Sequence, residues 1–292
     1  MNNWANLTFL VVFLGQIFFS SYYVPKRILA RLDRLRRDYP PGRYPRLYPR
    51  STESFSASRS LFQWSSRGVF ALGFVLLYGA VAMDGADGHI SDAWPAAYGL
   101  IQFMPLLVIE LLGFRQFRLM REANTDTTRK ADLRPRRLFD SVSPALLVLA
   151  LALMISVIGF DLYVVDFHLA WGSDAVQQAI VMVVSNLALA TVGLFQFHGR
   201  KLNPHQSASD RARQTRAQLT SLLLLSCAMS VFFIWQAAGD ALPLHDLDAT
   251  AMSLYFQLIV ALSIGFVLRS LRFEDIDFEV YAAKPATAKK HV

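Results

Sequence analysis

One charged side chain, Glu110, lies inside the long apolar stretches of this chain. An ionisable group within a membrane-spanning segment is rare and costly, which makes it a candidate for function. Glu110 sits four residues before the end of its stretch, about one helical turn from Arg115 and two from Arg118. We therefore expect its carboxylate to reach the polar edge of the membrane and pair there, with a functional intramembrane site as the alternative.

Uncharged amides are the other polar groups of the apolar stretches that could do chemistry. Asn186 lies at the middle of the fifth stretch, and Gln102, Gln178 and Gln257 occupy related positions in the third, fifth and seventh. Two interpretations are open. The glutamines could together line a polar pocket that opens to the outside. Alternatively, all four amides form hydrogen bonds between helices worth about 0.6–2 kcal/mol each, which is the commoner role.

Three histidines, His89, His168 and His245, stand beside aspartates in the short segments between stretches. They could supply a metal ion only if three separate loops converged, because no pair has a spacing that places both ligands on one helix face. We therefore predict no metal site.

Sequence motifs for catalysis are absent from the chain. It has no phosphate-binding glycine loop, no Gly-x-Ser-x-Gly, no His-Glu-x-x-His and a single cysteine, Cys227. We therefore expect no catalytic residues and no cofactor, and we do not expect an enzyme.

Seven apolar stretches dominate the chain, each long enough, or nearly so, to cross a hydrocarbon core about 30 Å thick as a helix. They are too continuously apolar for the alternating strands of a membrane barrel. The sequence therefore predicts an all-α integral membrane protein with one polytopic domain over 1–292. The predicted spans are 4–24, 68–83, 94–114, 141–160, 175–197, 217–239 and 249–268.

All 29 Lys and Arg residues fall on one side of the membrane once these spans are marked. They occupy the segments 25–67, 115–140 and 198–216 and the tail 269–292. Basic loops stay in the cytoplasm, so the N-terminus is predicted outside and the C-terminus inside, in a bacterial cytoplasmic (inner) membrane. The net charge of +7 follows from this topology, and we expect no nucleic acid as a partner.

A pseudo-repeat of about 78 residues relates the later spans. The histidines of the outer segments and the turn signals of the inner segments, including Asn124-Thr125 and Asn203-Pro204, recur at this spacing. The pattern predicts one unpaired first span followed by three tandem helical hairpins, made of spans two and three, four and five, and six and seven.

The first inner segment has two parts of its own. Residues 26–37 place Ile28, Leu32 and Leu35 on one face of a basic amphipathic helix, which we expect to lie on the inner leaflet. Anionic phospholipid headgroups would attract it by about 1 kcal/mol per basic residue. The predicted lipid contacts are Lys26, Arg27, Arg31, Arg34, Arg36 and Arg37.

Three Tyr-Pro pairs follow, beginning at Tyr39, Tyr44 and Tyr48. A residue before proline favours extended geometry, so this stretch is predicted to be an extended strap. It is either a docking strip for a cytoplasmic partner or a connector packed against the chain's own loops, and we favour the connector slightly.

The function expected from these features is that of a scaffold, assembly or signalling subunit acting through basic cytoplasmic loops. The bundle carries few polar interior groups, whereas the inner loops are elaborate. A transporter or channel for a small solute or lipid is the alternative, and a membrane enzyme comes third because ionisable groups in the spans are scarce.

Overall fold

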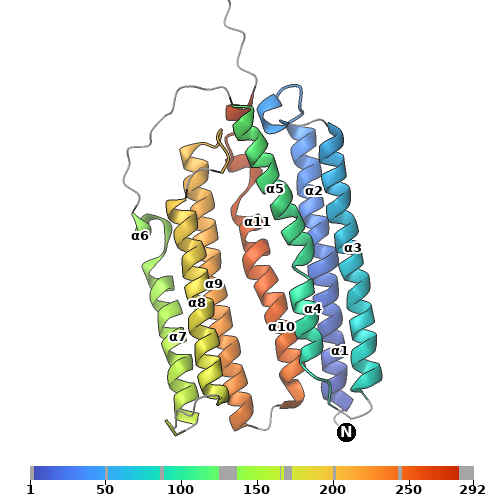
Figure 1. The fold of residues 1–292 in the computed structure, drawn as a ribbon, viewed down its shortest axis with the longest axis vertical. Coiled ribbons are helices and arrows are strands. Elements are labelled where there is room, and N and C mark those ends of the chain that lie inside the picture. The colour runs from blue at the N-terminus through green and yellow to red at the C-terminus, as the bar shows by residue number, and fades with distance from the viewer. Residues whose placement is uncertain are drawn as a thin grey trace, which may run out of the picture.

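The computed structural model describes residues 3–49, 52–85, 89–124, 137–164, 166–167, 173–199, 202–242 and 245–282. Seven helical rods in this part of the chain are long and apolar enough to cross a membrane, and each overlaps one predicted span. They stand side by side in Figure 1. The all-helical prediction is confirmed over the described residues, where no strand occurs. This is a multi-pass membrane protein.

The first rod is one continuous helix made of α1 (Asn3–Phe18), a π-helical turn η1 (Phe19–Tyr23) and α2 (Val24–Asp38). The remaining long helices are α3 (Thr52–Met83), α4 (Ala93–Ile101), α5 (Met104–Glu122), α7 (Pro144–Val164), α8 (Asp174–His198) and α9 (Ala208–Ala241). The last rod joins α10 (Asp248–Val260), a second π-helical turn η4 (Ala261–Gly265) and α11 (Phe266–Ser270). Shorter elements are η2 (Pro45–Leu47), α6 (Leu138–Ser141), η3 (His245–Leu247), η5 (Phe273–Asp275) and η6 (Glu279–Tyr281).

The third span is interrupted between α4 and α5. The chain turns at Gln102 and Phe103, and Pro105 lies in the first turn of α5. Proline fits there because its missing N–H would have no partner at a helix start. This break and the two π-helical turns are the backbone irregularities inside the described spans.

The rods form two groups that meet along α9 and α10 (Figure 1). Helices α7, α8 and α9 pack together on one side, whereas α1, α3 and α4–α5 pack on the other. Helix α10 contacts α1, α4 and α9 and so joins the two groups. Neighbours in each predicted hairpin do touch, but the internal repeat itself stays a prediction.

Helix α2 differs from the prediction of a helix lying flat on the leaflet. The segment is helical, but it continues α1 through η1 with helical backbone angles, so that part of the prediction is wrong. Ile28 is buried in a cluster with Phe62 and Val260, and Leu29 and Leu32 pack against it. The apolar face of α2, which was expected to contact lipid, therefore packs against other helices of the bundle.

The tyrosine strap packs against the chain's own tail. Tyr44, Phe278 and Tyr281 are buried together, and Tyr39 and Leu47 pack around them. The ring centroids of Tyr39 and Phe278 lie 3.7 Å apart. The connector interpretation therefore holds for Tyr39 and Tyr44. We call this assembly of strap and tail residues, Tyr39–Tyr48 with Phe273–Tyr281, the inner cap.

Candidate functional site

A cleft of about 600 Å³ opens between α2 and the last rod, at the basic end of the bundle. Both π-helical turns contribute to its walls, through Phe19 and Tyr23 on one side and Ala261 and Gly265 on the other. Single π-turns inside α-helices recur at functional sites, so two of them facing one cleft mark it as the leading candidate. The remaining lining residues are Val24, Arg27, Ala30, Arg31, Arg34, Leu268, Arg269, Arg272, Phe273 and Glu274.

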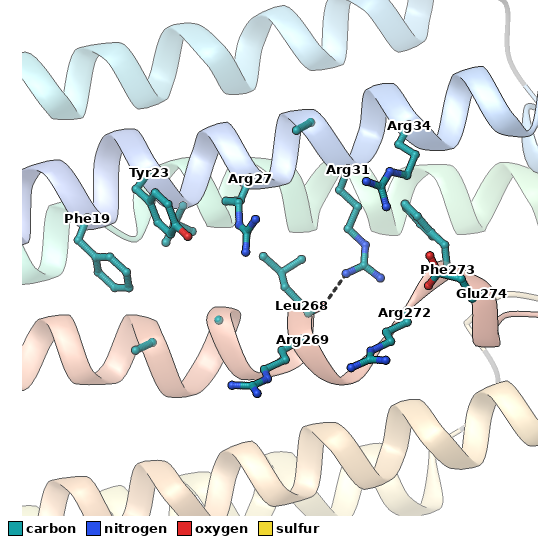
Figure 2. A pocket seen from close by; sticks show the side chains of 14 residues that line it. Phe19, Tyr23, Arg27, Arg31, Arg34, Leu268, Arg269, Arg272, Phe273 and Glu274 are labelled. Atoms are coloured by element: carbon teal, nitrogen blue, oxygen red, sulfur yellow. Dashed lines mark hydrogen bonds between the residues drawn. The ribbon is translucent and has the colours of Figure 1, made fainter.

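Helical spacing explains why three arginines of α2 share this wall. Arg27, Arg31 and Arg34 follow one another at four and three residues, which aligns them on one helix face. The neighbouring face carries Ile28 and Leu32 and packs into the bundle. Figure 2 shows the three arginines in a row along α2, with Arg269 and Arg272 on the segment across the cleft.

Arg31 has a structural task in this wall. Its guanidinium donates a hydrogen bond to the Leu268 carbonyl, at 2.6 Å, and another to the Leu271 carbonyl. It also lies 4.5 Å from the ring centroid of Phe273. The last carbonyls of a helix have no partners within that helix, and a cation is favoured there. Arg31 therefore ties the end of α11 to α2 (Figure 2).

Four other guanidiniums of the cleft are exposed, namely those of Arg27, Arg34, Arg269 and Arg272. Among the described residues, no carboxylate lies within ion-pair distance of any of them. Glu274 supplies the one negative charge of the lining. Arginine stays protonated at all physiological pH values and matches phosphate with paired donors. The site can therefore hold an anion, but its arginines cannot exchange protons with a substrate.

The other three predicted lipid contacts on α2 point elsewhere. Lys26 lies over the ring of Tyr22, at 5.5 Å, and Arg36 lies over Phe55, at 5.9 Å. Arg37 pairs with the adjacent Asp38 at 3.7 Å. The structure thus brings three of the six predicted residues into the cleft. Sequence reasoning assigned Arg269 and Arg272 only to a basic tail, although their position directly after the last span was visible.

A second polar site lies in the bundle interior, where Gln102 meets the first and last rods. Its carbonyl accepts a hydrogen bond from the Gln16 amide at 3.3 Å, and Ser253 donates to the Gln16 carbonyl at 2.8 Å. All three side chains are buried, and the Gln102 amide nitrogen has no partner. Sequence reasoning missed Gln16 and Ser253, although Gln16 was an amide within a predicted span.

The remaining predicted amides do not converge on Gln102 as one pocket. Gln257 donates to the Val12 carbonyl on α1 at 3.0 Å, and Asn186 accepts a hydrogen bond from Ser226 on α9 at 2.5 Å. Both are therefore hydrogen bonds between helices. Gln178 is half-buried on α8, in the other helix group from Gln102.

Glu110 is exposed on α5, beside the exposed side chains of Leu107, Leu111 and Phe114. Among the described residues Glu110 forms no ion pair with Arg115 or Arg118, and Arg118 bonds Glu122 instead, at 3.0 Å. The carboxylate thus sits on the outer surface of the bundle and does not line its interior.

The histidines form no metal-binding group in the part of the chain that the structure describes. His245 lies 3.2 Å from Asp248, and His89 is exposed. His168 lies outside the described residues, so the absence of a metal site stays a prediction.

No family model matches this chain, and no curated protein and no solved structure matches it either.

Proposed function

We propose that this multi-pass membrane protein is a non-enzymatic scaffold, assembly or signalling subunit of a bacterial cytoplasmic membrane. It acts through its basic end, which the positive-inside rule assigns to the cytoplasm. The observation that carries this proposal is the inner cap. The strap and the tail are joined there, and the start of α9 holds the tail, so that they form one preformed surface. Preformed surfaces bind partners at a lower entropic cost.

Specific polar contacts hold this surface together. The Asn203 amide donates to the Tyr281 hydroxyl at 2.6 Å, and the Asp277 backbone amide donates to the Asp210 carboxylate at 3.1 Å. Arg213 on α9 donates to the Asp275 carbonyl at 2.6 Å. These contacts fix the tail against α9, so the charged groups of the cap are presented in one arrangement.

Photo-crosslinking in intact cells tests the proposal. A photoreactive amino acid at Gly42 or Asp277, both exposed on the inner cap, is expected to give a discrete protein adduct. The same probe at Ala93 or Leu242, at the opposite end of the bundle, serves as the control. Adducts with lipid alone at both ends would contradict a role that acts through protein partners.

A transporter or channel for a small solute or lipid is the second candidate, and one observation favours it. The third span breaks at Gln102, and interrupted helices with free polar groups form the substrate sites of many transporters. A Gln102→Cys variant in a Cys227→Ala background tests it. Reaction with a membrane-impermeant thiol reagent would support a water path to the break, and an unreactive thiol would argue against transport.

A further inference from the structure

We propose that the cleft between α2 and the last rod binds one anionic phospholipid whose headgroup carries two phosphate charges. The phosphates lie among Arg27, Arg34, Arg269 and Arg272, and the acyl chains run along the apolar floor between the two π-helical turns. The proposed lipid site is independent of the proposed scaffold function, because lipid binding requires only that the helix bundle lies in a membrane.

The distribution of polarity along the cleft matches an amphiphile. Phe19 and Val24 lie within the predicted first span, and Ala261 and Gly265 lie within the predicted seventh span. The arginines begin just beyond these spans, and Phe19 to Arg34 covers about 22 Å at 1.5 Å per residue. An apolar floor at membrane depth, followed by a basic mouth at the surface, fits a molecule with chains at one end and charge at the other.

The walls leave room for acyl chains because their residues are small where the rods face each other. Ala30, Ala261 and Gly265 line the cleft without long side chains. A side-chain atom added at Gly265 would meet no atom closer than 4.0 Å, which shows the space above this residue. The π-helical turns widen their rods locally at the same place, η1 on the first rod and η4 on the last.

Charge balance sets the headgroup class. Arg31 and the four exposed arginines face the one carboxylate of Glu274, so the lining of the cleft carries an excess of four positive charges. A head with a single phosphate neutralises one of them, whereas a head with two phosphates neutralises half of the excess. Basic pockets between membrane helices on the cytoplasmic side bind cardiolipin-type headgroups.

The matched pair of variants for a test lies on α2 itself. Arg27→Gln with Arg34→Gln removes two charges from the cleft, whereas Arg36→Gln with Arg37→Gln removes two charges that point elsewhere. Arg31 is left intact, because its hydrogen bonds hold the end of α11. Both variants change the net charge equally, so nonspecific attraction to an anionic surface falls equally in both.

The measurement is a lipid titration of the purified full-length protein in detergent, followed by native mass spectrometry. Cardiolipin, phosphatidylglycerol and phosphatidylcholine are the lipid probes. We expect one cardiolipin to bind more tightly than the other two lipids. The cleft variant is expected to weaken it roughly 30-fold, which is about 2 kcal/mol for two arginines, and the control variant less than about twofold. Equal losses in the two variants, or no loss in either, would overturn the proposal.

A second experiment separates a lipid from a free phosphate compound. Gly265→Leu fills the apolar floor without changing any charge, and Ala261→Leu does so one helical turn earlier on the same rod. Either variant, with an unchanged thermal transition, is expected to weaken cardiolipin binding and leave any binding of inorganic pyrophosphate unaffected. The assignment to a lipid would be overturned if neither variant weakened cardiolipin binding. It would also be overturned if pyrophosphate bound as tightly as cardiolipin.

Discussion

Tyr39, at the end of α2, stacks on Phe278 of the tail, with ring centroids 3.7 Å apart and planes 27° apart. Their contact joins two segments separated by almost the whole chain, and Phe278 is 7% exposed. Two aromatic rings packed against each other stabilise a fold in two ways, by burying apolar area and by the favourable interaction of suitably oriented rings. The position of the tail therefore depends on this pair.

Phe278→Ala is expected to release the tail from the inner cap. Removing a buried phenyl ring costs about 3 kcal/mol or more, which is at least as much as any one of the nearby polar contacts supplies. Hydrogen exchange of residues 273–281 in the purified protein is the measurement, and faster exchange is the expected result. Phe195→Ala is the control, because Phe195 is 73% exposed. Unchanged exchange in the tail would show that the polar contacts hold it alone.

Gln16→Leu is expected to destabilise the bundle. The change leaves the Gln102 carbonyl and the Ser253 hydroxyl buried without partners, at a cost of roughly 1–3 kcal/mol. Replacing all three groups together, as Gln16→Leu, Gln102→Leu and Ser253→Ala, is expected to recover part of the loss, because none of these three positions then carries a buried polar side chain. Thermal unfolding in one detergent measures this. Thr8→Val, at an exposed position of α1, is the control, and a triple variant less stable than the single one would refute the account.

Alkaline pH is expected to loosen the inner cap through Tyr281. Burial raises the pKa of its hydroxyl to about 12, so the folded cap favours the neutral form. The buried neutral hydroxyl therefore adds to the stability of the folded cap. Because its pKa is raised on folding, this stabilisation is fully present below the ordinary tyrosine pKa of about 10 and is lost as the pH rises from there towards 12. Tyr281→Phe should reduce the dependence in proteolysis of the tail between these pH values. The remainder comes from Tyr44, whose pKa is raised by burial and by its hydrogen bond to Glu279. Tyr78→Phe, at an exposed position, should preserve the whole dependence.

The topology predicts opposite labelling of two serines. In a Cys227→Ala background, Ser91→Cys is expected to react with an impermeant thiol reagent added to intact cells, and Ser207→Cys only after permeabilisation. Ser207 caps α9 by accepting a bond from the Asp210 amide at 3.1 Å, so the exposed neighbour Ser209 provides a second position. Labelling of both inner positions from outside would reverse the predicted orientation.

The sequence predicts the seven rods because apolar continuity over about 20 residues is a local property. The π-helical turns and the break at Gln102 depend on packing between distant segments, and only Pro105 hints at the break. The cleft likewise has one wall that the sequence predicts and one that it does not. Arg27, Arg31 and Arg34 were recognisable from helical spacing. The opposite wall of the cleft comes from the far end of the chain, as in the hydrogen bond from Arg31 to Leu268, which lie 237 residues apart. No local sequence pattern predicts a contact at that separation.

Contacts between the first and last rods also impose an order on biosynthesis. Ser253 bonds Gln16 across 237 residues, and Gln257 bonds the Val12 carbonyl across 245. Because synthesis starts at the N-terminus, α1 enters the membrane well before α10 exists. Until then the Gln16 carbonyl lacks its serine partner, and the bundle cannot close. A chain that stops before Asp248 therefore keeps an incompletely bonded amide in its first span.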